Sequence, residues 1–228
     1  MKRCLPLLLL LLLKITIASA QINTFQLSLQ SGIAIPVFDF SSTNLEKGSF
    51  ALPGFTGSAE INWIHNNLWG VSISSGIQLN PIAVGILGYE KVKADPFLED
   101  LYIRSDPFKV VHIMAGPSYT SRISKSFSLM AQLKGGVFLS YTPYQLYKPD
   151  YFQTGPPYYE ITTSKDLSFA YGAGVHLNYE ISPCYSVGIG SEIMSSKASF
   201  EFRSGQSIRT DNKVISLWNN NLILTINL

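Results

Sequence analysis

Alternating apolar and polar residues run through the segment Gly57–Asn80, GSAEINWIHNNLWGVSISSGIQLN. In its second half, the odd-numbered positions from Trp69 to Leu79 are mostly large and apolar. The even-numbered positions from Gly70 to Asn80 hold only glycine, serine, glutamine or asparagine. A period of two is the repeat of a β-strand whose two faces meet different surroundings. The first half alternates in the same way, and the short His65-Asn66-Asn67 link predicts a hairpin.

The same alternation recurs along the chain and predicts eight strands. Besides the two strands of this hairpin, we expect Thr24–Ile35, Lys109–Thr120, Ser126–Tyr141, Leu167–Glu180, Tyr185–Ile193 and a last strand ending at Leu228. The connections between strands are alternately long and short, and the long ones are Pro36–Pro53, Pro81–Pro107, Thr142–Asp166 and Ser195–Asp211. Long loops at one end and tight turns at the other are typical of outer-membrane barrels.

We therefore predict an all-β fold, an eight-stranded antiparallel up-and-down transmembrane β-barrel. Both ends of the mature chain should lie at the short-turn, periplasmic side. An extra hairpin within Ile82–Ile103 would raise the number of strands to ten.

The first twenty residues have the features of a secretory signal peptide. Lys2 and Arg3 precede the apolar block Leu5–Leu13, and Ala18-Ser19-Ala20 is a typical cleavage site. The apolar block is far shorter than the ~20 residues that a membrane-spanning helix needs. We therefore expect residues 1–20 to be removed after Ala20 and residues 21–228 to form an outer-membrane barrel domain.

The mature chain is expected to be nearly neutral, because the leader contributes three of the basic residues. It offers no basic patch for nucleic acid. Cys184 would be its only cysteine, so an internal disulfide is excluded and a redox role is not expected.

Alternation alone fits both a membrane barrel and a soluble, lipocalin-like barrel with an inward apolar face. The polar face favours the membrane barrel, because it carries small uncharged residues, which suit a crowded eight-stranded interior. Charged residues make up 14% of the chain, against a usual ~25%. Aromatic residues also flank the three short turns, as in a membrane-interface girdle, although aromatics are common in strands generally. These residues are Trp63, Trp69, Tyr119, Phe127, Tyr179 and Tyr185.

Three stretches carry a resemblance to a known family: GIAIP, the hairpin GFTGSAEINW…GVSISSGIQL, and MAGPSYTSRISKSFSLMAQLKGGVF. With the signal peptide, they resemble the outer-membrane β-barrel domain proteins of Bacteroidetes, often labelled porin-family or PorT-like. This group is similar in plan to the OmpA transmembrane domain and OmpX. The resemblance implies insertion by the outer-membrane insertion machinery and brings no catalytic residues. Such barrels commonly end in an aromatic residue, whereas this chain ends in Leu228.

Charged residues and histidines on the polar face are the candidates for chemistry inside the barrel. The set is Glu60, His112, Lys134, His176 and Glu192. A buried charge requires a partner, so we predict a network of Lys134 with carboxylates that fills the lumen. The alternative is a gated pore, as in a narrow porin or transporter for small solutes.

Neither catalysis nor metal binding is expected. Catalytic outer-membrane barrels need a histidine beside a serine or a carboxylate. His65 falls in a periplasmic turn, and His112 and His176 show no such motif at the outer rim. These scattered residues make no metal site, and no cofactor is expected. A lipid-modifying enzyme stays an alternative.

The third long link is rich in tyrosine and proline. Its tyrosines are Tyr144, Tyr147, Tyr151, Tyr158 and Tyr159. Tyrosines give binding loops broad contact area at low entropic cost. They would bind a protein, a glycan or lipopolysaccharide, or instead fold over the rim and pack on one another or on lipid headgroups. The function expected is therefore a non-enzymatic envelope scaffold or binding module.

Overall fold

The computed structural model describes residues 23–65, 68–152, 155–204 and 207–228. The predicted signal peptide and two residues of the first turn, Asn66 and Asn67, lie outside these residues. Within the described chain, no helix has the length and apolar character needed to cross a membrane.

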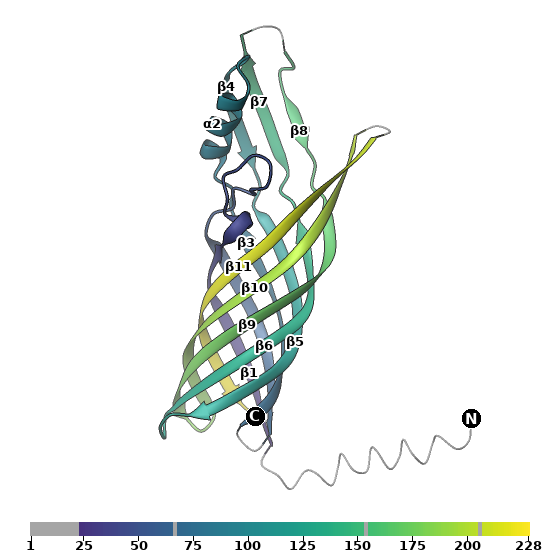
Figure 1. Cartoon of the computed structure of the whole chain (residues 1–228). Helices are drawn as coiled ribbons and strands as arrows, with labels where there is room; N and C mark the ends of the chain where they lie inside the picture. Colours follow the sequence, from purple (N-terminus) through teal and green to yellow (C-terminus); the bar gives the residue numbers. More distant parts are fainter. Residues whose placement is uncertain (1–22, 66–67, 153–154, 205–206) are drawn as a thin grey trace, which may run out of the picture.

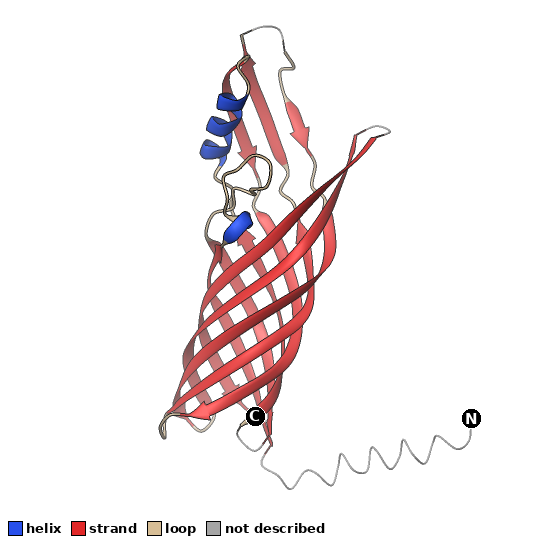
Figure 2. Cartoon of the chain, viewed as in Figure 1, coloured by secondary structure: helices blue, strands red, loops and turns tan. Residues whose placement is uncertain are grey.

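Eight strands close into a ring (Figures 1 and 2). They are β1 (Asn23–Pro36), β2 (Gly54–His65), β3 (Trp69–Asn80), β5 (Phe108–Arg122), β6 (Phe127–Tyr141), β9 (Lys165–Ser182), β10 (Tyr185–Ser204) and β11 (Ser207–Asn227). Each strand pairs antiparallel with the next one of the ring, and β1 pairs with β11 to close it. The predicted eight-stranded up-and-down barrel is confirmed.

A separate unit, which we call the cap, stands on the long-loop end of the barrel (Figure 1). It consists of helix α2 (Val84–Ala94) and a sheet of three strands, β4 (Leu98–Ser105), β7 (Gln145–Tyr151) and β8 (Tyr159–Ile161). A 3₁₀ turn, η2 (Phe38–Phe40), follows β1 at the same end. Strand β4 falls mostly within the stretch where an extra hairpin was considered. It pairs with β7 of the cap, so the ten-stranded alternative is wrong.

The prediction of a polar link over Ser195–Asp211 is wrong. Strands β10 and β11 continue through it as a long hairpin, paired as far as Ser204 with Ser207. In this extension the inward side chains of β10 are apolar, with Ala198 and Phe200 buried, whereas their partners on β11, Lys213 and Asp211, are charged. On β10 the polarity of the two faces is thus the reverse of that in the ring, where apolar residues point outward.

The barrel wall turns large apolar side chains outward and small polar ones inward. Leu222, for example, is 71% exposed, whereas its neighbour Asn221 is 6% exposed. The exposed apolar residues recur on every strand of the ring, among them Leu29, Ile61, Ile73, Ile113, Leu133, Val175, Ile189 and Leu222. A continuous apolar surface of this extent needs lipid around it. The lipocalin-like alternative, which puts the apolar face inside, is therefore excluded.

The ladder between β5 and β6 is interrupted around Pro117. Pairing runs to Ala115–Gly135 and resumes at Ser118–Gln132 in the same register. Proline has no N–H to donate to a ladder. Beside it, the backbone of Gly116 approaches β6 so closely that an added Cβ would overlap the carbonyl of Leu133. Glycine at this position is therefore required by the close approach.

We expect Gly116→Ala to lower the free energy of unfolding by at least about 1–3 kcal/mol, the usual cost of overpacking. The matched control is Gly135→Ala, because an added Cβ there would meet only Phe169, at 3.7 Å. Urea unfolding in lipid vesicles measures both variants. Equal stability of the two variants would contradict the close approach.

Candidate functional site

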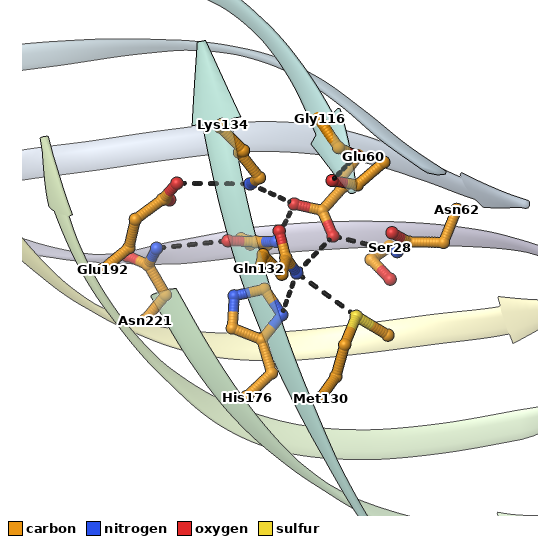
Figure 3. Close-up of polar contacts among 12 residues, drawn as sticks. Ser28, Glu60, Asn62, Gly116, Met130, Gln132, Lys134, His176, Glu192 and Asn221 are labelled. Atoms are coloured by element: carbon orange, nitrogen blue, oxygen red, sulfur yellow. Dashed lines mark hydrogen bonds and ion pairs between the residues drawn. The ribbon is translucent and has the colours of Figure 1, made fainter. Parts of the chain in front are cut away.

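A buried ion cluster joins three strands across the middle of the lumen (Figure 3). Lys134 Nζ on β6 lies 2.6 Å from Glu60 Oε2 on β2 and 3.2 Å from Glu192 Oε1 on β10. All three side chains are almost completely buried. The structure thus brings together all three charged residues that the sequence places in the lumen.

Amide side chains complete the coordination of Glu60. Glu60 Oε1 accepts hydrogen bonds from Asn62 Nδ2 at 2.8 Å and from Gln132 Nε2 at 2.9 Å. Gln30 Nε2 lies 3.4 Å from Glu60 Oε2, and Gln132 Nε2 also lies 3.0 Å from His176 Nδ1. The sequence shows these amides on the polar face, but the period of a strand does not indicate which of them meet across the lumen.

His112 lies apart from the ion cluster, nearer the long-loop ends of the strands. Its Nδ1 lies 3.3 Å from Gln78 Nε2, and its ring faces Phe138 at 6.2 Å. Both lumen histidines therefore have glutamine partners in the structure, whereas hydrolytic sites use a serine or an acidic partner. In the described part of the chain, no three His, Cys, Asp or Glu side chains are grouped as metal ligands would be.

Apolar side chains fill the mouth of the barrel at its long-loop end, above the ion cluster. Phe40 from η2 packs edge-on against Phe108 of β5, with 5.2 Å between ring centroids. The other members of this layer are fully buried and comprise Phe138, Phe200, Ile215 and Leu217. The lumen is thus filled by a polar layer and, above it, by an apolar layer.

A cavity of about 600 Å³, which we call the cap cavity, lies between the cap and the long hairpin of β10 and β11. Its apolar lining includes Phe50, Ile82, Leu87, Phe108, Tyr147 and Phe200. Its charged lining comprises Lys91 of α2, Glu160 of β8, and Arg209, Asp211 and Lys213 of β11. The sequence does not indicate this cavity, because its lining comes from four separate connections.

The five loop tyrosines differ in exposure and do not form one exposed surface. Tyr147 is buried and stacks on Tyr159, with 4.6 Å between ring centroids and 5° between planes. Burial raises the pKa of the Tyr147 hydroxyl well above its usual range. Tyr144 and Tyr151 are half-buried, and Tyr158 is exposed. Packing of the aromatics on one another, the alternative considered above, describes Tyr147 and Tyr159.

The aromatic residues proposed for the membrane interface point outward near the short turns. Trp69 packs on Tyr119, and Phe127 on Tyr179, each at 4.9 Å between ring centroids. Trp63 and Tyr185 are exposed beside them, and Phe25, which the sequence analysis missed, pairs with Trp63 across β1 and β2. A second set lies outward toward the long loops and comprises Phe55, Phe169, Tyr171 and Trp218. Two aromatic girdles around an apolar band are typical of membrane barrels.

Comparison with solved structures gives the same architecture. Neisserial surface protein A aligns with a TM-score of 0.50 and 11% identity, over 89% of this chain and 96% of that one. The chain has the outer-membrane β-barrel fold. The outer-membrane protein AlkL, solved in lipid bilayers, aligns with a TM-score of 0.51 and 10% identity, over 90% of both chains. At such identities the likeness of this outer-membrane β-barrel to either structure concerns the fold alone. No protein-family model matches the chain, and neither does any curated protein.

Proposed function

We propose that this protein resides in the outer membrane and acts without catalysis, binding a ligand or partner through its extracellular cap. The observation that carries the proposal is the cap cavity, which lies above a lumen filled by side chains. A protein built to conduct would need an open path where this one has an ion cluster and an aromatic layer.

The closed lumen supports binding over transport on grounds of size and energy. Eight strands leave an interior that side chains can fill. Opening a path would require separating Lys134 from Glu60 and Glu192, and these charges are stable away from water only when paired. Transport through this lumen would therefore need a large rearrangement.

The cap supports binding because it is folded rather than irregular. Together with the hairpin of β10 and β11, its sheet and helix line a cavity of a size that holds a small molecule elsewhere in proteins, about 300–1,000 Å³. Phe50 in the lining has a positive φ of 53°. Backbone strain of this kind is concentrated at functional sites.

We also propose how the protein reaches the outer membrane. A signal peptide cleaved near Ala20 would direct export, and the outer-membrane insertion machinery would assemble the barrel. Membership of the Bacteroidetes porin-family or PorT-like group belongs to the same proposal and rests on the sequence resemblance. Lipopolysaccharide would surround the barrel, and an envelope or extracellular protein is a further partner that the cap could contact.

Conductance in planar bilayers tests the closed lumen. We expect the wild-type protein, once shown to migrate faster unboiled than boiled on a detergent gel, to give no conductance steps above the empty bilayer. Regular steps that Lys134→Ala abolishes or alters would favour a narrow porin instead. A change in lipid A mass when the protein is overproduced would favour a lipid-modifying enzyme. Either result would contradict the proposal.

A further inference from the structure

The cap cavity has a mostly apolar and aromatic wall. Phe50, Phe108 and Phe200 belong to the buried core at the mouth of the barrel, and Tyr147 adds a buried ring from the cap. Rings of this kind present flat apolar surface to whatever fills the space. Most of a ligand in this cavity would therefore be apolar.

The lining of the cap cavity also carries more basic than acidic side chains. Of the five charged residues in the lining, Lys91, Arg209 and Lys213 are basic and two are acidic. Lys213 is already engaged, because its Nζ donates to the Gly48 carbonyl at 3.0 Å and lies 3.7 Å from Asp211. The other acid, Glu160, lies against the hydroxyl of Tyr144. The lining therefore carries one net positive charge, and Lys91 and Arg209 are its two basic residues outside the Lys213–Asp211 pair.

The ammonium group of Lys91 is destabilised by its surroundings. Its Nζ lies over the ring of Tyr147, 5.0 Å from the centroid, and the residue is only partly exposed. Burial and, to a lesser extent, the charge of Arg209 lower the pKa of the Lys91 ammonium. An anion in the cavity would relieve both effects, since it would pair with the ammonium and screen it from Arg209.

We propose that the cap cavity binds one small organic anion, with its acidic group at Lys91 and Arg209 and its apolar body against the aromatic wall. This inference rests on the proposed binding function and adds the chemical class of the ligand. A carboxylate, sulfate or sulfonate on a ring system or short chain has the required chemistry.

A matched pair of probes tests the role of charge. Naphthalene-2-sulfonate and the uncharged naphthalene-2-sulfonamide are titrated calorimetrically into the full chain in phosphatidylcholine nanodiscs, with empty nanodiscs as the blank. We expect the sulfonate to bind at least about tenfold more tightly, the effect of one hydrogen bond to a charged group. The difference should shrink as salt is added, because ions screen the partly exposed charges.

Two variants locate the charge. Lys91→Met should weaken sulfonate binding about tenfold and leave sulfonamide binding unchanged. Lys93→Met, an exposed lysine two residues along the same helix, is the matched control and should change neither. If Lys91→Met fails to give the fast-migrating folded band, Arg209→Gln on the exposed hairpin replaces it, with the same expected loss.

Three outcomes would overturn the inference. They are equal affinity for the two probes, no binding of either probe, and sulfonate binding that is unchanged in the folded cavity variant. If the two probes bind with equal affinity and the bilayer shows no conductance, the proposed binding function is retained. The cavity would then be assigned to neutral apolar ligands. Failure of the proposed binding function would be seen in a different experiment, as conductance steps in the planar bilayer.

Discussion

We expect Lys134→Met to lower the free energy of unfolding by about 3–5 kcal/mol. This is the usual cost of removing one partner of a buried ion pair. The substitution leaves Glu60 and Glu192 buried without their shared cation, whose Nζ lies 2.6 and 3.2 Å from them. Methionine has nearly the length of lysine, so packing changes little. Urea unfolding in lipid vesicles, followed by tryptophan fluorescence, measures the difference.

The rescue variant separates charge from packing. Combining Lys134→Met with Glu60→Gln and Glu192→Gln should recover most of the lost stability, since uncharged groups of similar shape replace the whole cluster. Lys125→Met, in the exposed short turn between β5 and β6, is the control and should stay within about 0.5 kcal/mol of wild type. A loss below about 1 kcal/mol for Lys134→Met alone would show that water reaches the cluster.

Phe40→Ala is expected to have a comparable effect at the mouth of the barrel, about 3–5 kcal/mol. Phe40 is fully buried, and its ring packs against Phe108. Removing it leaves a hole between the apolar layer and the 3₁₀ turn that carries it, which the surrounding strands cannot close. The same unfolding assay measures the loss.

The matched control lies two residues earlier in the same 3₁₀ turn. Phe38 is 72% exposed, so Phe38→Ala should change stability by no more than about 0.5 kcal/mol. Equal losses for the two variants would mean that the turn itself, rather than the buried ring, holds the mouth closed.

The barrel was predictable because one strong period repeats along it. The bounds predicted for the third strand, Trp69–Asn80, are those of β3. The extension of β10 was missed because its buried residues, Ala198 and Phe200, are apolar and face inward, the reverse of the pattern in the ring. Helix α2 was missed for a local reason: its N-cap is Ala83, whose side chain cannot cap the helix, and Gly85 and Gly88 interrupt its sequence.

The ion cluster and the cap cavity also differ in how far the sequence predicts them. Lys134 and Glu192 could be placed at a similar height by counting along strands from their turns. The cap cavity could not be anticipated, because Lys91, Tyr147 and Arg209 meet only through the folding of three long connections. Periodicity predicts the face on which a residue lies, and it carries no information on how one loop packs on another.

The closure between β1 and β11 determines when the barrel can form. Three side-chain hydrogen bonds inside the lumen join these strands: Ser28 to Thr225 at 2.8 Å, Gln26 to Asn227 at 3.0 Å, and Asn221 to Gln30 at 3.2 Å. The partners in each pair are 191 to 201 positions apart in the chain. Contacts of such long range form slowly. Until β11 pairs with β1, both edges of the sheet stay open, so the unclosed chain is prone to aggregation until its final strand is in place.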